Sequence, residues 1–201
     1  NGGGYRKWYG LEEDIVNWEN DGAEIKNHII NRYPYLNGNY SFVVKNESKY
    51  FQEGITWGAI SSSDLSVRRF RPGRLFSNAG MAVHGEGDII DFLIAFLNSK
   101  VSKKILGILS PTLNFNQGNI DSLPIRIMNK DNVIKISKNN VSNLECDWDS
   151  FETSWDFAAH PLLIKNKLEA APNTIEKNYM NWKDSTNSNF DKLKGNEEEI
   201  N

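Results

Sequence analysis

The sequence predicts an α+β fold, in which a small, twisted, mostly antiparallel sheet with packed helices precedes a helical spacer. Two observations support this expectation. In residues 35–60 apolar side chains alternate with polar ones, as in half-buried strands, and Gly54 and Gly58 interrupt the pattern. From Asp88 onward apolar residues instead recur at three- to four-residue steps, which is typical of helices.

The residues before Asp88 are expected to form mainly strands. A helix over 23–32, with isoleucines at helical spacing, is the exception, and Pro34 ends it. Glycines inside a strand pattern indicate bulges or close backbone approach. The predicted strands and strand-like pieces are 14–18, 40–44, 49–51, 55–60, 75–78 and 81–83.

The later part of the chain is expected to be mainly helical. Residues 88–109 are predicted to form a helix pair, or one helix broken near Ser99. Residues 125–127 are read as a strand, and 132–146 as a strand followed by a cap. A final helix starts after Thr174 and carries a narrow apolar stripe, as in a helix packed on another helix. Its acidic end, 196–201, is expected to fray.

Composition narrows the function classes. The 201 residues are 39% apolar and 24% charged, as in soluble globular proteins, and the net charge of −3 gives no global basic field. Cys146 is the only cysteine, which excludes a disulfide framework and a cysteine-based zinc site and suits the cytoplasm. The longest apolar run, 89–97, contains Asp91 and is too short to span a bilayer, so no membrane partner is expected.

The densest cationic cluster lies between residues 67 and 74, where Pro72-Gly73 suggests a hairpin-like tip. Arginine is the preferred side chain for two-pronged contact with phosphate or guanine. A solvated charged turn is the alternative interpretation. The four arginines of this cluster are Arg68, Arg69, Arg71 and Arg74.

Two further segments suit nucleic acid. Arg6 and Lys7 stand between aromatic residues in the segment 5–9, which suits phosphate contact with base stacking, although an ordinary edge strand has the same pattern. The loop 110–125 concentrates amides, which can read a base edge or satisfy the loop's own backbone. Its candidate readers are Asn114, Asn116 and Gln117.

Motifs for catalysis are missing from the sequence. The histidines and carboxylates show no metal-ligand spacing, and no Gly-x-Ser-x-Gly elbow occurs. The Asn/Asp-Pro-Pro-Tyr/Phe tetrapeptide of amino-methyltransferases is absent, as is a glycine-rich turn for S-adenosylmethionine. We therefore expect no catalysis and no cofactor in this chain alone.

Several motifs together resemble a known family. The stretch from Thr112 to Ile125, with Leu123-Pro124-Ile125 at its end, is similar to target-recognition domains of type I specificity subunits and of fused restriction–modification methyltransferases. The more specific motifs are Tyr5–Gly10, Val16–Gly22, Glu53–Trp57 and Asp149–Phe157, which resemble the C-terminal half of the PglX family, the adenine-specific DNA methyltransferases of BREX phage defence.

The resemblance implies a DNA target-recognition domain over 1–127, a connecting docked segment over 128–172 and a helical spacer over 173–201. It implies double-stranded DNA as partner, a catalytic domain upstream that uses S-adenosylmethionine, and contacts with other phage-defence proteins. The alternatives are a protein-interaction module using 147–157 and the last helix, or a carbohydrate-binding domain built on six tryptophans. DNA binding requires the arginine cluster and residues 5–9 to share a face.

Overall fold

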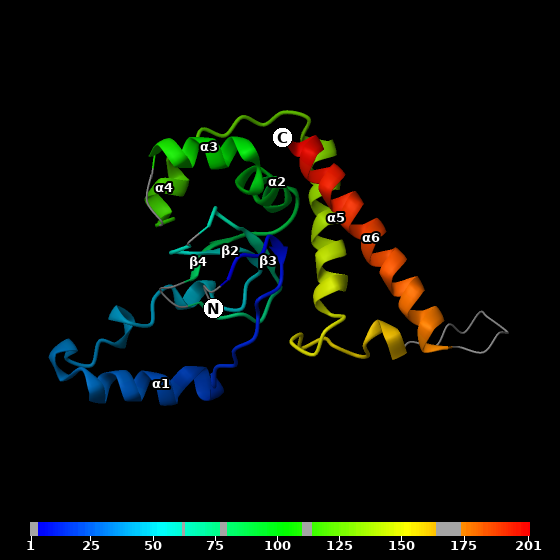
Figure 1. Cartoon of the computed structure of the whole chain (residues 1–201). Coiled ribbons are helices and arrows are strands. Elements are labelled where there is room, and N and C mark those ends of the chain that lie inside the picture. The colour runs from blue at the N-terminus through cyan, green and yellow to red at the C-terminus, as the bar shows by residue number, and fades with distance from the viewer. Residues whose placement is uncertain (1–3, 62, 77–79, 110–113, 164–173) are drawn as a thin grey trace.

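The computed structural model describes residues 4–61, 63–76, 80–109, 114–163 and 174–201, and it confirms the α+β class. A four-stranded sheet lies at the centre, with helices above it and a pair of long helices beside it (Figure 1). The strands are β1 (Trp8–Tyr9), β2 (Gly54–Gly58), β3 (Arg68–Phe70) and β4 (Gly80–His84), in the order β1-β3-β2-β4. The β1–β3 pair is parallel and the other two pairs are antiparallel.

The sheet confirms the strands predicted near 55–60 and 81–83. Gly54 shows the predicted close approach, because an added Cβ would meet the carbonyl oxygen of Val83 and the ring of Phe70. The predicted hairpin-like tip at Pro72-Gly73 is wrong, because β3 pairs with β1 and β2 and β4 lies beyond β2. Of the predicted piece 75–78, residues 75 and 76 form no strand, and residues 77 and 78 lie outside the described residues.

The core lies between the sheet and the helices α2 (Asp88–Asn98), α3 (Lys100–Leu109) and α4 (Gln117–Asp121). This arrangement confirms the predicted helix pair. Its side chains come from every layer, because apolar faces of strands and helices must be buried against one another. The most completely buried apolar members are Trp8, Ile55, Trp57, Val67, Ile90, Ile94, Ala95 and Leu106.

Helix α5 (Lys130–Trp148) replaces the strand predicted over 132–146. Its β-branched residues favour strands locally, but the buried residues Ile134, Ser137 and Asn140 recur at helical spacing. Val141 packs against the core, and the helix contacts α2. The neighbouring prediction for 125–127 is also wrong, since these residues form no strand and Ile127 is 54% exposed.

Helix α6 (Ile175–Ile200) packs against α5, as predicted, and diverges from it toward its N-terminus (Figure 1). The Thr174 hydroxyl caps it by accepting from Lys177 N at 3.2 Å. The expectation that the acidic end frays is wrong. Leu193 and Ile200 pack on the core, and Glu197 accepts from the Trp8 indole at 2.8 Å.

Residues 19–51 form a lobe that projects from the sheet (Figure 1). It contains the predicted helix as α1 (Glu19–Arg32), followed by the 3₁₀ turns η1 (Pro34–Leu36), η2 (Tyr40–Phe42) and η3 (Glu47–Lys49). Residues 14–18, 40–44 and 49–51 form no strands, so the strands predicted there are wrong. The alternation at 40–44 has no sheet face to fill, and Phe42 is 66% exposed.

A short 3₁₀ turn, η4 (Pro161–Leu163), follows the acidic and aromatic residues of 147–157. Residues 164–173, within the predicted connecting segment, lie outside the described residues. In the part of the chain that the structure describes, no helix combines the length and the apolar content that crossing a membrane requires.

Candidate functional site

Strand β3 carries the first two arginines of the cluster in the middle of the sheet. The buried side chain of Asn98, at the end of α2, holds Val67, the residue just before β3. It bonds both the N–H and the C=O of Val67, each at 2.9 Å. Because side chains alternate along a strand, Arg68 and Arg69 then point to opposite faces.

Arg69 faces helix α2 and lies in an ion-pair network. Its guanidinium contacts Asp91 at 2.5 Å and Glu53 at 2.8 Å, and Asp91 is only 4% exposed. Lys138 of α5 approaches the other Asp91 oxygen at 3.6 Å. The geometry therefore gives Arg69 a bridging role between the sheet and α2.

Arg71 and Arg74 follow β3 and are also paired. Arg71 contacts Glu145 and, at 3.1 Å, Asp156, and its guanidinium lies 5.8 Å from the Tyr9 ring centre. Arg74 contacts Glu12 through Nε. Their side chains are 46% and 33% exposed, which makes them the most accessible of the cluster.

Arg6 and Lys7 tie the segment before β1 to the two long helices. Arg6 pairs with Asp147 at 2.8 Å and stacks 5.1 Å from the Trp148 ring centre, while Lys7 approaches Glu197 at 3.4 Å. Because β1 pairs in parallel with β3, the structure brings the 5–9 segment and the arginine cluster together. DNA contact by these six cations stays a prediction.

The amide loop is attached to the sheet rather than open along its length. Phe115 is 7% exposed, its N–H bonds the Ala59 carbonyl at 2.8 Å, and its carbonyl accepts from the Trp57 indole at 2.8 Å. Asn116 caps α4 by accepting from Asn119 N at 3.1 Å. Residues 110–113 of the loop lie outside the described residues.

The three candidate readers of this loop remain exposed. Asn114 forms an isolated bridge with Ile60, and its carbonyl accepts from the Asn119 amide at 3.0 Å. Gln117 begins α4. Among these three, Asn116 bonds the loop's own backbone through its side chain. Base contact by Asn114, Asn116 and Gln117 stays a prediction.

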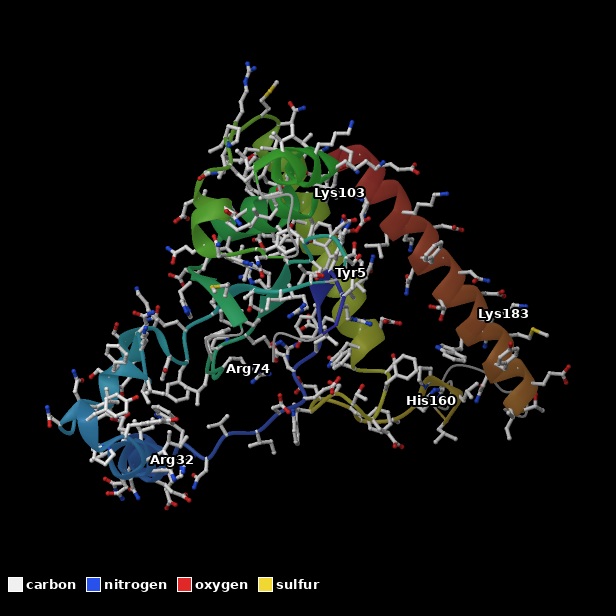
Figure 2. The ribbon with its side chains drawn as sticks, turned by 60° about the vertical axis from the view of Figure 1, so that its left-hand side comes forward. Tyr5, Arg32, Arg74, Lys103, His160 and Lys183 are labelled. Carbon is white, nitrogen blue, oxygen red and sulfur yellow. The ribbon has the colours of Figure 1, made fainter. Side chains whose placement is uncertain are left out.

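A cavity of about 400 Å³ opens between the sheet and the segment that leads to α1. Arg68 lines it from β3, Arg74 from the following loop, and Trp155 from the segment after α5. Figure 2 shows Arg74 in this position, between the sheet and the lobe. The lining also includes Glu12 and Phe51.

Arg68 is the unusual member of this cavity. It is 2% exposed, and its Nη1 has no hydrogen-bond partner among the residues that the structure describes. Burial lowers the pKa of its guanidinium, and the charge of Glu12 acts in the opposite direction. Burial likewise lowers the pKa of nearby His84, whose ring packs edge-on against Phe70 and Phe76.

The sequence did not predict the carboxylates that pair with the arginines, or the cavity that Arg68 lines. The acidic run Glu12–Asp14 and the lone Trp155 were visible in the sequence, but nothing in their spacing places them beside Arg68. Among the described residues, no group of three or more His, Cys, Asp or Glu side chains could hold a metal ion.

No family model matches the chain. It is 36% identical over 203 aligned residues to the "Adenine-specific methyltransferase PglX" of Lacticaseibacillus casei (strain Zhang), and 31% identical over 203 to the "Adenine-specific methyltransferase BrxX" of Escherichia coli O9:H4 (strain HS). Each alignment covers 100% of this chain but only 16% and 15% of those proteins. The resemblance predicted from the sequence is thus confirmed: along its whole length, the chain matches one region of the PglX and BrxX adenine-specific methyltransferases.

Proposed function

We propose that the chain is the DNA target-recognition region of a site-specific adenine-N6 methyltransferase of bacterial phage defence. It would hold and read the duplex in the cytoplasm. A catalytic domain elsewhere in the parent protein would bind S-adenosylmethionine and transfer its methyl group. The observation that carries this proposal is the match of the whole chain to two proteins named adenine-specific methyltransferases, of which it spans about one sixth.

The accessible arginines support a DNA-facing role for the edge of the sheet. Arg71 and Arg74 are partly exposed, and Arg71 stacks on Tyr9 beside the Arg6–Trp148 pair. Exposed ion pairs are worth only about 0–1 kcal/mol, so DNA phosphates can replace their carboxylates at small cost. We assign phosphate contact to Arg71, Arg74 and Arg6, and assign Arg68 and Arg69 to positioning β3.

Phosphate contacts position a duplex but do not read its sequence. We assign base reading to the region 55–80, which contains β2, β3 and the chain between them. The amide loop would position this region, because Phe115 and Trp57 fasten it to β2. Replacing 55–80 in the full-length protein with the matching residues of a relative that has another site should change the methylated sequence, as read by methylation-sensitive sequencing. An unchanged methylated sequence would contradict this assignment.

The phosphate assignment is tested by salt dependence in the full-length protein. Arg71→Gln with Arg74→Gln should weaken binding to every duplex, and the slope of log K against log salt should fall by about 0.9 per lost contact. Lys183→Gln, on α6, is the matched control because it removes a cation from an exposed position away from the sheet. An unchanged slope in the double variant would refute the assignment.

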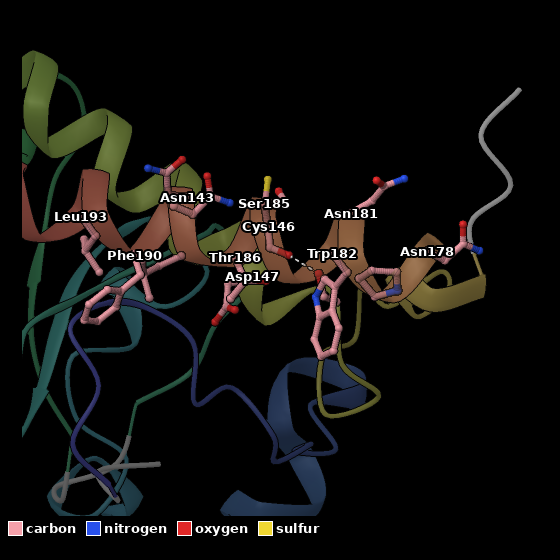
Figure 3. A pocket seen from close by; sticks show the side chains of 14 residues that line it. Asn143, Cys146, Asp147, Asn178, Asn181, Trp182, Ser185, Thr186, Phe190 and Leu193 are labelled. Carbon is pink, nitrogen blue, oxygen red and sulfur yellow. Dashed lines mark hydrogen bonds between the residues drawn. The ribbon is translucent and has the colours of Figure 1, made fainter. Parts of the chain in front are cut away.

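A protein-interaction module remains the second candidate, because α5 and α6 enclose a cleft of about 460 Å³. In Figure 3 the rings of Trp182 and Phe190 extend from the same side of α6, and Phe190 is 64% exposed. The carbohydrate alternative receives less support. All six tryptophans lie in the described residues, yet Trp155 is the one that is mostly exposed, at 59%.

A further inference from the structure

The lobe formed by residues 19–51 differs in composition from the rest of the chain. Its stretch from 25 to 46 contains no aspartate or glutamate, although the whole chain has 26 of these residues. The same stretch contains five asparagines and three cations, Lys26, Arg32 and Lys45. A surface with cations and amides but no carboxylates suits a polyanion such as DNA, because no negative group of its own repels the phosphates.

The lobe is held in shape by Lys26 at its centre. The ammonium group of Lys26 contacts Asp21 at 2.8 Å and Glu47 at 2.6 Å, and it lies 5.0 Å from the centre of the Tyr40 ring. Lys26 therefore ties α1 to the turns η2 and η3. Because the lobe is ordered before a partner arrives, less conformational entropy is lost when it binds.

The surface of the lobe presents amides that are not used within the protein. Its asparagines are all exposed, and none of their side chains bonds another described residue; they are Asn27, Asn31, Asn37, Asn39 and Asn46. Asn37 and Asn39 flank Gly38 at the turn between η1 and η2, where a Cβ added to Gly38 would meet nothing within 4 Å. A free amide can donate and accept together, as contact with the edge of an adenine requires.

Two aromatic side chains are exposed close to these amides in the sequence. Phe42 is 66% exposed and Tyr35 is 74% exposed. Lys45 lies 5.6 Å from the centre of the Phe42 ring, and both side chains line a hollow of about 430 Å³ together with Asn39. Large apolar side chains that gather on a surface mark an interaction site.

The lobe is joined to the loop that carries the accessible arginines. Phe51 N donates to Arg74 O, and Gly73 N donates to Phe51 O, each at 3.0 Å. Figure 2 shows Arg74 where the lobe meets the sheet, and Arg32 on the lobe itself. A duplex whose phosphates contact Arg71 and Arg74 therefore lies next to the base of the lobe.

We propose that the tip of the lobe, residues 35–46, enters the major groove of the bound duplex and reads bases there. The major groove is about 12 Å wide and distinguishes all four base pairs, whereas the minor groove, about 6 Å wide, mainly separates A·T from G·C. Asn37 and Asn39 contact base edges, and Phe42 packs on a thymine methyl group. The inference rests on the proposed function, and it adds the lobe to the region 55–80 as a second base reader.

The cations of the lobe contact the phosphates beside the groove. Arg32 and Lys45 are exposed and pair with no carboxylate among the described residues, so no ion pair has to break when DNA binds. In the full-length protein, Arg32→Gln with Lys45→Gln should weaken binding to every duplex. The slope of log K against log salt should fall by about 0.9 per lost contact.

Base reading is tested with the duplex that the full-length protein methylates, identified by methylation-sensitive sequencing, and with the same duplex after each base pair is replaced in turn. Asn37→Ala with Asn39→Ala should weaken binding to the methylated duplex by about 5- to 150-fold per lost base contact. Binding to an unrelated duplex should not change, and discrimination should fall at the base pairs that the amides read. Asn139→Ala with Asn187→Ala, at exposed positions of α5 and α6, is the matched control.

The aromatic contact has its own matched pair of variants. Phe42→Ala should weaken binding to the methylated duplex but not to an unrelated one. Phe190→Ala, which removes a ring that is 64% exposed on α6, should leave both affinities unchanged.

Unchanged discrimination in the Asn37 and Asn39 double variant would overturn the inference. Lower methylation with unchanged DNA binding would also overturn it, because the lobe would then contact another protein surface. The proposed function is tested separately by Arg71→Gln with Arg74→Gln, which still lowers the salt slope if only the lobe inference fails. A full-length protein that prefers no duplex over another would overturn both.

Discussion

The Asn98→Ala variant tests how the sheet is held against helix α2. The Asn98 side chain bonds both the N–H and the C=O of Val67, the residue that leads into β3. Val67 is fully buried, so water cannot replace the lost partner.

The two lost bonds differ in cost. Asn98 Oδ1 is the partner of the Val67 N–H, and an orphaned buried donor costs about 1–3 kcal/mol. The Val67 carbonyl loses Asn98 Nδ2 but keeps the Trp8 N–H at 2.9 Å, so this loss is nearer 0.5–1 kcal/mol. The free energy of unfolding should therefore fall by about 1.5–4 kcal/mol.

Urea unfolding of the 201-residue chain, followed by tryptophan fluorescence, measures this change. Asn139→Ala is the matched control, because the same substitution at an exposed position of the described helix α5 should change stability by less than about 0.5 kcal/mol. If Asn98→Ala and Asn139→Ala have equal small effects, the two bonds to Val67 do not hold the sheet against α2.

Three further predictions follow from the described contacts. Trp182→Ala should lower the free energy of unfolding by about 1–2 kcal/mol, less than the loss of a core tryptophan would. The reason is that the Trp182 ring is only partly buried, beside His160 with 5.2 Å between ring centres. An effect of about 3 kcal/mol or more would place Trp182 in the core. Asn116→Ala should remove the α4 cap and lower the free energy of unfolding in urea by about 1 kcal/mol. In the full-length protein it should lower methylation without changing the methylated sequence. A new methylated sequence would make Asn116 a base reader. Burial, aided by the charge of Glu12, raises the pKa of Tyr9 from 10.0 to about 12. The stability that this shift contributes is therefore complete below pH 10 and is lost as pH rises to about 12. Tyr9→Phe should lack this loss when unfolding is measured across that pH range, and identical pH profiles of the two proteins would contradict the shift.

The fold was predictable from the sequence where one periodicity dominated. The apolar spacing of residues 88–109 gave both helices, and Gly54 correctly indicated close backbone approach. Helix α5 was missed because the β-branched residues Val133, Ile134 and Ile136 favour strands locally, whereas packing on α2 decides their conformation. Tertiary contacts, and not local strand propensity, thus decide the conformation of these residues.

The site was predictable only as a set of residue types. The sequence singled out Arg71 and the aromatic segment around Tyr9, and the structure places them together. The carboxylates that pair with Arg71 lie 74 and 85 residues further along the chain, so no local pattern could reveal them. For the same reason, the meeting of Arg68 and Glu12 in one cavity could not be predicted from the sequence.

The bond between Trp8 and Glu197 also has a consequence for how the protein is made. The two residues are 189 positions apart, so β1 emerges from the ribosome long before the last turn of α6. At about 5–20 residues per second, the wait is roughly 10–40 s. During that interval Trp8 and the neighbouring Lys7 lack their final partner, and the edge of the sheet stays open to chaperones or to pairing with a second chain. The last turn of α6 therefore protects β1, and a ribosome that stalls before this turn is made would leave the strand unprotected.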